Sequence, residues 1–248
     1  FERDVPTEQR SKLRKMVSAR GDRKPLQYVL GHMEFYGRKF EVNESVLVPR
    51  QATELVVDKC LEKIPGDGGE MRVGDVGTGS GVIAITLGCE RNALRVDATD
   101  SSSAALEVAR RNARLNAVED RVEFHQGHLV EPIRKIVGDI SDGFGVLASN
   151  PPYIPSDRIE ELQAEVSEWE PREALDGGPD GLEAVSELIA DGAQVLRPGG
   201  WMVMELGEGQ ADTVRDLVER AESLDPGSVE TVLDDGCERV LAVQKQEN

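Results

Sequence analysis

The stretch MRVGDVGTGSGVIAITL, residues 71–87, decides the fold. The pattern predicts a short strand over residues 71–76 and a glycine-rich turn at Gly77-Thr78-Gly79-Ser80-Gly81. The apolar residues 82–87 that follow predict the start of a helix. Glycines allow a ligand to lie against bare backbone at the N-terminus of a helix. The stretch therefore predicts a strand-turn-helix unit of an α/β sheet, with a ligand at the turn.

The next expected strand, residues 94–99, leads directly into Asp100. An acidic residue at this position can hold the ribose hydroxyls of an adenosine cofactor. Residues 79–84 also fit the pattern G-x-G-x-x-A of NAD-binding proteins, so this region alone leaves NAD and S-adenosylmethionine open. Asp97 is the rival ribose ligand, and a tight turn that binds nothing is the plainer alternative.

A second informative segment, Asn150-Pro151-Pro152-Tyr153, follows the apolar run 144–149. Two prolines cannot extend a strand, so they predict a rigid turn at the carboxyl end of the strand, where open α/β sheets bind ligands. The alternatives are an ordinary strand-ending turn and, for Tyr153, an aromatic residue of the core. The tetrapeptide resembles the signature of S-adenosylmethionine methyltransferases that methylate a planar NH2 nitrogen.

An amide substrate explains why such a turn would be useful. The lone pair of an amide nitrogen is conjugated with the carbonyl, as a rotation barrier of ~18–20 kcal/mol shows. We expect the side-chain oxygen of Asn150 and the carbonyl of Pro151 each to accept one N–H of the substrate amide, with Tyr153 packed on its plane. No catalytic base is expected, because a methylated amide nitrogen is strongly acidic and water can take its proton.

The size and the charge of the chain limit its fold and the partners that it can bind. The 248 residues suffice for one sizeable α/β domain with a small extension, and their net charge is −18, from 47 acidic and 29 basic residues. Such a surface repels a phosphate backbone, which argues against direct nucleic-acid binding unless the basic residues between 10 and 24 form a local patch. An acidic surface also suits a salty cytoplasm, although an ordinary acidic enzyme is the simpler interpretation.

Several absences narrow the interpretation further. No apolar stretch approaches membrane-spanning length and no signal peptide is recognised, so a cytoplasmic protein without a membrane partner is expected. Cys60, Cys89 and Cys237 are far apart, which suggests neither disulfides nor zinc. His125 and His128 are interpreted as strand-end and loop residues, so no metal is expected.

The chain is organised as a helical start, a linker and an α/β body. A basic amphipathic helix is expected over residues 7–20, and because the chain begins at Phe1 it is interpreted as the end of an N-terminal module. Residues 27–48 alternate like strands and predict a β-hairpin linker. Beyond them the sequence predicts strands at 71–76, 94–99, 121–125, 144–149 and 201–205, helices at 52–63, 81–89, 102–115, 182–195 and 208–223, and a final hairpin at 228–233 and 238–244. This order predicts a mostly parallel sheet covered on both faces, with an antiparallel pair at one edge.

From about Arg23 onward the chain resembles the HemK/PrmC-type protein-(glutamine-N5) methyltransferases, which methylate the glutamine of the Gly-Gly-Gln loop in peptide chain release factors. The matching blocks, in family order, are residues 25–28 with Gly31, 35–37, 46–50 with Thr53 and Glu54, 75–81, Asp100 with Ser102, Ala105 and Leu106, 149–153, 170–171, 174–175, 177–178, 180–182, and Glu205 with Gly207. Two positions depart from the family pattern. Gln51-Ala52 replaces a proline and a carboxylate, and His128-Leu129 replaces an acidic-aromatic pair near the adenine.

The resemblance implies a class I S-adenosylmethionine-dependent methyltransferase, Rossmann-like, with a seven-stranded, mostly parallel sheet. It implies three parts: residues 1–25 from a helical substrate-recognition domain, the hairpin linker 26–50, and the methyltransferase domain 51–248. The cofactor would be held by Asp75, Gly77, Thr78, Gly79, Ser80, Gly81, Asp100, His128, Leu129 and Asn150, and the substrate by Asn150, Pro151, Pro152 and Tyr153, with Asn150, Pro151 and Tyr153 catalytic.

The implied substrate is a release factor. A glutamine of a ribosomal protein, the amino groups of adenine or guanine in nucleic acid, and NAD-dependent oxidation or cofactor binding without catalysis remain the alternatives.

Overall fold

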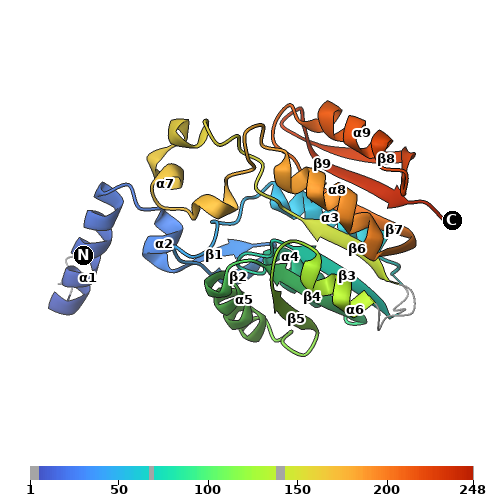
Figure 1. Ribbon diagram of the computed structural model, residues 1–248. Helices are drawn as coiled ribbons and strands as arrows, with labels where there is room; N and C mark the ends of the chain where they lie inside the picture. The colour runs from blue at the N-terminus through green and yellow to red at the C-terminus, as the bar shows by residue number, and fades with distance from the viewer. Residues whose placement is uncertain (1–5, 67–69, 138–142, 248) are drawn as a thin grey trace.

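The computed structural model describes residues 6–66, 70–137 and 143–247. A seven-stranded sheet with helices on both faces forms the body of the protein, and α1 projects from it (Figure 1). The strands of the sheet are β3 (Met71–Val76), β4 (Leu94–Asp100), β5 (Val122–Gln126), β6 (Phe144–Ser149), β7 (Leu196–Glu205), β8 (Leu224–Asp234) and β9 (Cys237–Lys245). Their order is β5-β4-β3-β6-β7-β9-β8.

The first five strands in this order pair in parallel, whereas β9 is antiparallel to both β7 and β8. The chain moves outward from β3 to β4 and β5 on one side, then returns and continues with β6 and β7 on the other. Such a reversal opens a crevice at the carboxyl ends of the central strands, which here are β3 and β6. The predicted α/β fold, with an antiparallel pair at one edge, is confirmed.

Two groups of helices cover the sheet. They are α3 (Thr53–Lys63), α4 (Val82–Glu90) and α5 (Ser103–Leu115) on one face, and α6 (Glu131–Val137), α8 (Glu183–Val195) and α9 (Ala211–Arg220) on the other. Each face has its own apolar core, which is why β3 and β6 are buried along almost their whole length instead of alternating. The sequence prediction missed α6, a short helix that contributes the fully buried Ile133.

The N-terminal part differs from the expected hairpin at both of its ends. Helix α1 (Thr7–Gly21) is followed by α2 (Leu26–Leu30), and only then by the hairpin of β1 (His32–Phe35) and β2 (Arg38–Glu41). The prediction of strand is therefore wrong for residues 27–30, which are helical, and for residues 42–48, which follow β2 without forming a strand. Pro25 precedes the first turn of α2 and Gly31, at φ 78°, ends it, a combination that is typical of a short helix.

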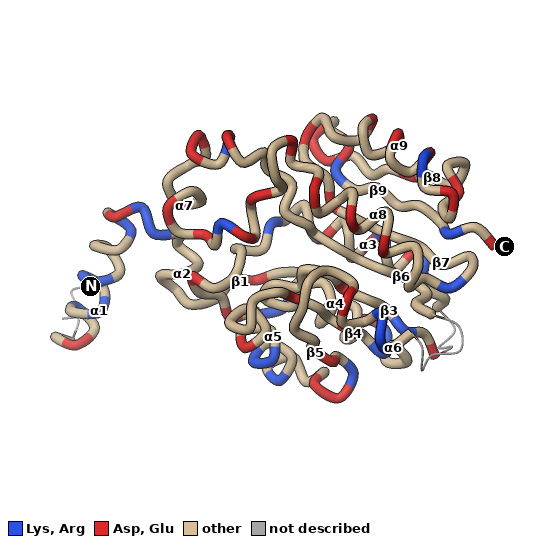
Figure 2. The backbone as a smooth tube through the Cα atoms, viewed as in Figure 1, with Lys and Arg blue, Asp and Glu red and all other residues tan. Residues whose placement is uncertain are grey.

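The predicted helix over residues 7–20 is present as α1. It does not pack an apolar face against the rest of the protein, because none of its residues is buried. Leu13 and Val17 are 57% and 64% exposed. Lys and Arg gather on and just after α1, while Asp and Glu are spread over the rest of the molecule (Figure 2). The proposed division at residues 25 and 50 stays a prediction, and residues 1–5 of its first part lie outside the described residues.

Residues 150–182 form a long connection between β6 and α8. It contains the 3-10 turns η1 (Ile159–Glu161) and η2 (Arg172–Ala174) and the short helix α7 (Ala164–Ser167). The run of glutamates in this connection is divided among these elements and does not form one helical face; its members are Glu160, Glu161, Glu165, Glu168 and Glu170. Two of its members bind the chain's own arginines: Glu165 pairs with Arg20 and Arg23, and the buried Glu170 pairs with Arg50.

Candidate active site

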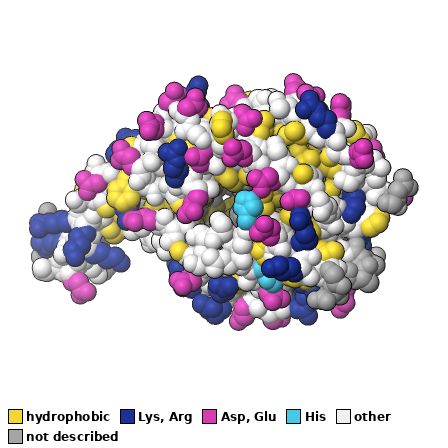
Figure 3. Space-filling view, viewed as in Figure 1, with side chains coloured by type: hydrophobic (Ala, Val, Ile, Leu, Met, Phe, Trp, Pro, Cys, Tyr) yellow, Lys and Arg dark blue, Asp and Glu magenta, His cyan; other side chains and the backbone are white. Residues whose placement is uncertain are grey.

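A cavity of about 350 Å³ opens at the switch point of the sheet. Figure 3 shows the hollow in the face turned to the viewer, with acidic side chains at its border. It is lined by residues from six segments: 45–47 with Pro49 and Thr53; 77–80 with Val82 and Ile83; 100–102 with Ala105; His128 and Leu129; Asn150 and Pro152; and 171, 173, 174, 176, 183, 184 and 187. The turns after β3 and β6, found separately in the sequence, therefore share one site.

The glycine-rich turn follows β3 as predicted. Gly79 has a φ of 55° and Gly81 a φ of 86°, left-handed conformations that glycine adopts without strain. A Cβ at Gly79 would meet no atom within 4 Å, so this part of the turn is open toward a ligand. Backbone at such a turn, just before α4, is suited to hold an adenosine cofactor.

Asp75, near the end of β3, holds this turn through hydrogen bonds. Its side chain is completely buried, and Oδ2 accepts hydrogen bonds from the hydroxyl of Thr78 at 2.6 Å and from the backbone N–H of Ala84 at 3.1 Å. Burial raises the pKa of Asp75 to about 6, although these two hydrogen bonds lower it. Asp75 was predicted to hold the cofactor but is not among the cavity-lining residues, which favours a role in organising the glycine-rich turn over direct contact with the cofactor.

Asp100 lines the cavity at the end of β4. Its Oδ2 accepts from the N–H of Gly79 at 2.8 Å, and its Oδ1 accepts from the N–H of Ser102 at 2.9 Å. Burial raises the pKa of Asp100, and these N–H donors oppose the shift. The rival residue Asp97 binds Arg72 and His125 and does not line the cavity, so Asp100 is the better placed of the two carboxylates.

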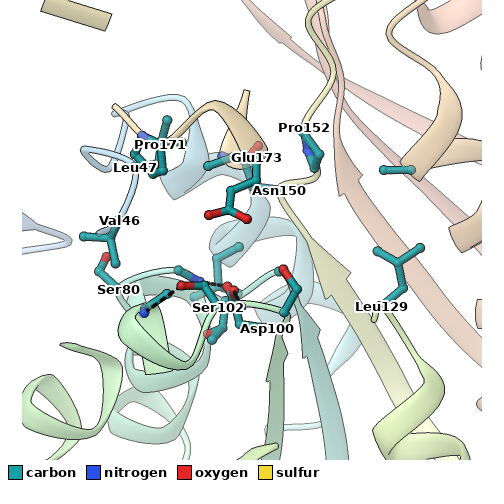
Figure 4. Close-up of a pocket in the computed structure, with 18 of the residues that line it drawn as sticks. Val46, Leu47, Ser80, Asp100, Ser102, Leu129, Asn150, Pro152, Pro171 and Glu173 are labelled. Atoms are coloured by element: carbon teal, nitrogen blue, oxygen red, sulfur yellow. Dashed lines mark hydrogen bonds between the residues drawn. The ribbon is translucent and has the colours of Figure 1, made fainter. Parts of the chain in front are cut away.

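Asn150 lies across the cavity from Asp100 (Figure 4). Its side-chain Nδ2 donates to the hydroxyl of Thr53 at 3.0 Å, and that hydroxyl donates to Oε2 of Glu205 at 2.7 Å. Oε1 of Glu205 accepts from the phenol of Tyr153 at 3.1 Å. Burial raises the pKa of Glu205, while its hydroxyl donors and the charges of Arg239 and Arg50 lower it.

The other residues of the Asn-Pro-Pro-Tyr turn are placed differently. Pro152 lines the cavity and Pro151 is buried. Tyr153 is not among the lining residues, because its phenol is turned to Glu205; burial and that carboxylate raise the pKa of Tyr153. The expected stacking of Tyr153 on a substrate amide stays a prediction.

The linker supplies one wall that sequence analysis did not assign to the site. Val46, Leu47 and Pro49 line the cavity opposite Leu129 (Figure 4). This wall is fixed in two ways: the hydroxyl of Tyr28 donates to the carbonyl of Val46 at 2.5 Å, and Val46 and Val48 pack in a small core with α5. The only signal for it was the run of family-like residues at 46–50.

His128 and Leu129, which were predicted to lie near the adenine, both line the cavity. Nε2 of His128 lies 2.7 Å from a carboxylate oxygen of Glu187, and the carbonyl of Leu129 accepts from the hydroxyl of Thr99 at 2.8 Å. The lining includes the carboxylates of Asp100, Glu173, Asp176, Glu183 and Glu187, and no Lys or Arg among the described residues. This charge suits a cationic ligand and disfavours a phosphate backbone.

One carboxylate-histidine group lies outside the cavity. Asp97, Glu123 and His125 have ligand atoms within 4.8 Å of one another. Arg72 already donates two hydrogen bonds from its terminal nitrogen and one from Nε to Asp97, so a cation occupies the buried carboxylate. The group is explained as an ion-pair network, and the expectation of no metal stays a prediction.

The strand order, with an antiparallel β9 between β7 and β8 and a ligand cavity at the switch point, is that of the class I methyltransferases, which take their methyl group from S-adenosylmethionine. The residues present fit this cofactor: an open glycine backbone, a carboxylate where ribose hydroxyls can bind, and an acidic lining for a cation. The NAD interpretation leaves the Asn-Pro-Pro-Tyr turn unexplained.

Comparisons with known protein families and sequences agree with the assignment to the methyltransferases and narrow it to one family. The methyltransferase small domain family matches residues 50–165. A release factor glutamine methyltransferase of Geobacter sulfurreducens is 40% identical over 220 residues, 89% of this chain and 74% of that protein. One of Moorella thermoacetica is 45% identical over 194 residues, but the chain spans only 65% of its length. The chain therefore belongs to the release factor glutamine methyltransferase family.

A solved structure supports the same assignment. The release factor-specific protein-(glutamine-N5) methyltransferase of Alicyclobacillus acidocaldarius matches with a TM-score of 0.50 and 27% identity, covering 84% of this chain and 99% of that chain.

None of the helices in residues 6–66, 70–137 and 143–247 combines the length and the hydrophobicity that a membrane span requires.

Proposed function

We propose that this protein transfers a methyl group from S-adenosylmethionine to the side-chain amide nitrogen, N5, of the glutamine in the Gly-Gly-Gln loop of peptide chain release factors. The observation that carries the proposal is that Asn150 lines the same cavity as the glycine turn and Asp100. An amide-binding side chain therefore faces the place where a methyl donor would be held. Family membership supplies the substrate class.

Bound S-adenosylmethionine supplies an electrophilic methyl group on a sulfonium. The chain's own residues provide orientation. Gly77, Thr78 and Gly79 offer backbone groups beside the donor, and Asp100 offers a carboxylate for ribose hydroxyls. On the substrate side, Oδ1 of Asn150 accepts one amide N–H and the carbonyl of Pro151 the other, which turns the nitrogen lone pair toward the donor. Orientation of this kind can contribute roughly 7–11 kcal/mol to lowering a barrier.

Proton transfer needs no side-chain base. The nitrogen that gains the methyl group bears a positive charge and loses a proton to water. The reaction neutralises a cation instead of creating an anion, so the site needs no group that stabilises a new negative charge, and the apolar side chains of Val46, Leu47 and Leu129 in its lining are compatible with it. Release factors act on ribosomes, and we accordingly place the protein in the cytoplasm.

Transfer of labelled methyl from S-adenosylmethionine tests the proposal. The purified protein should label a release factor, and mass spectrometry of the tryptic peptide should place the methyl group on the glutamine of Gly-Gly-Gln. A release factor with Gly-Gly-Ala is the matched control and should stay unlabelled. Label on DNA, RNA or a ribosomal protein instead of the release factor would overturn the substrate assignment.

A further inference from the structure

The buried carboxylate of Glu205 lies behind the cavity and is not explained by cofactor or substrate contact. It is 1% exposed, at the end of β7, and it is absent from the cavity lining. Both of its oxygens face hydroxyl groups, Oε2 that of Thr53 and Oε1 that of Tyr153. Thr53, 2% exposed at the start of α3, is the member of this group that reaches the cavity beside Asn150.

The number of hydroxyl and amide hydrogens fixes which atom donates and which accepts in the hydrogen bonds from Asn150 through Thr53 to Glu205. In its ionised form, which the charges of Arg239 and Arg50 favour, the Glu205 carboxylate only accepts, so the single hydroxyl hydrogen of Thr53 is used on Glu205. The same hydroxyl oxygen can then only accept from Asn150, which must present its NH2 group to Thr53. With the nitrogen fixed there, the remaining atom of the carboxamide, Oδ1, is the one available as an acceptor for a substrate N–H.

We propose that Thr53 and Glu205 are positioning residues that hold the Asn150 carboxamide in the one orientation, of two related by a half-turn, in which its oxygen can accept the substrate amide. The role of the oxygen rests on the proposed function, whereas the fixed orientation does not. A carboxamide turned the other way would present donors to the donor N–H groups of the substrate. Both residues act indirectly: Glu205, which is absent from the cavity lining, acts through Thr53, and Thr53 acts through Asn150.

Thr53→Val and Thr53→Ser form a matched pair for the test. Valine keeps the shape and the branched Cβ but has no hydroxyl, whereas serine keeps the hydroxyl. With a Gly-Gly-Gln release factor, Thr53→Val should lower kcat by about tenfold to a hundredfold, the range expected when a reacting group is misplaced by about 1 Å. The KM for S-adenosylmethionine should change little, and Thr53→Ser should restore most of the rate.

Glu205→Gln tests whether Glu205 acts through Thr53. Glutamine replaces one of the two acceptor oxygens with a donor NH2 group, so only one of its two amide orientations still accepts from Thr53. The direction at Thr53 is then no longer enforced, and kcat should fall. The double variant Thr53→Val with Glu205→Gln should be little slower than Thr53→Val alone, because both changes break the same chain of hydrogen bonds. Rates are measured well below each variant's melting temperature, so that lower stability alone does not reduce kcat.

A substrate-free readout separates this inference from the proposed function. In NMR spectra the side-chain NH2 signals of Asn150, assigned by their absence in Asn150→Ala, should exchange slowly in the wild type and in Thr53→Ser and faster in Thr53→Val. If the wild type methylates no glutamine, the proposed function fails while this exchange still judges the orientation. The inference is overturned if exchange is the same in all three proteins, if Thr53→Val keeps kcat within about twofold, or if serine fails to rescue.

Discussion

The guanidinium of Arg50 donates to Oε1 of Glu170 at 2.6 Å, joining two segments that are 120 residues apart. The Glu170 side chain is 2% exposed and that of Arg50 is 37% exposed. Arg50 follows the linker wall at Val46 to Pro49, and Glu170 immediately precedes the cavity-lining Pro171. The ion pair therefore connects two walls of the cavity without itself lining it.

Removing Arg50 should destabilise the folded protein, because it leaves the buried carboxylate of Glu170 without its cation. We expect Arg50→Ala to lower the free energy of unfolding by roughly 3 kcal/mol, the low end for breaking a buried pair because Arg50 is partly exposed to solvent. Burial raises the pKa of Glu170 and Arg50 opposes it, so the variant's carboxyl should take up a proton more readily. A raised folded pKa favours the folded state at lower pH, so the defect should be smaller at pH 5 than at pH 8.

Urea unfolding at both pH values measures this effect. Arg158→Ala is the control, because its ion pair with Glu161 joins side chains that are 64% and 62% exposed. Such a pair should contribute under about 1 kcal/mol at either pH. Equal effects of the two substitutions would contradict a special contribution of the buried pair.

The pKa of Asp75 predicts a second pH dependence. Burial raises it to about 6 from an ordinary 3.8, so the folded state binds a proton more tightly than the unfolded state. The stability from this group is present below pH about 4 and is lost as the pH rises through about 6. Asp75→Asn has no such proton, so between pH 5 and pH 7 the wild type should lose roughly 1–2 kcal/mol more than the variant. Parallel curves of unfolding free energy against pH would argue that Asp75 titrates normally.

Cofactor binding gives a third prediction. Asp100→Ala should weaken S-adenosylmethionine binding by roughly 1.5–3 kcal/mol, the scale of hydrogen bonds to a charged acceptor. Isothermal titration calorimetry measures the affinity directly. The comparison variant is Asp97→Asn, which should lose stability rather than affinity because Asp97 faces Arg72 and His125. Unchanged affinity in Asp100→Ala would remove Asp100 from the ribose site.

The elements that sequence predicted best are those whose signal is local. Residues 71–87 contain a buried strand, a glycine turn and a helix start in succession, and the structure has all three. Residues 27–30 were mistaken for strand because the run is too short to show a helical period, and the influence of Pro25 and Gly31 outweighed the apparent alternation. The short helix α6 was missed because its single buried side chain, Ile133, gives no periodic pattern.

The same distinction holds at the site. Asp100 and Asn150 each follow a recognisable strand, and both line the cavity. The direction of the Tyr153 phenol could not be predicted, because it depends on Glu205, 52 residues further along the chain. The contact of Asn150 with Thr53 likewise spans 97 residues. Only the packing of α3 against β6 and β7 of the sheet brings these side chains together.

The last prediction concerns the reaction at Asn150. We expect Asn150→Ala to bind S-adenosylmethionine normally but to methylate a Gly-Gly-Gln release factor on the order of a hundredfold more slowly or worse, as for the loss of one preorganised polar contact in a transition state. Asn150→Asp keeps an acceptor oxygen and should be faster than Asn150→Ala. It should stay slower than the wild type, because its second oxygen cannot donate to Thr53 as Nδ2 does. Single-turnover rates at saturating cofactor make the comparison, and a near-normal rate for Asn150→Ala would mean that the substrate amide is held elsewhere.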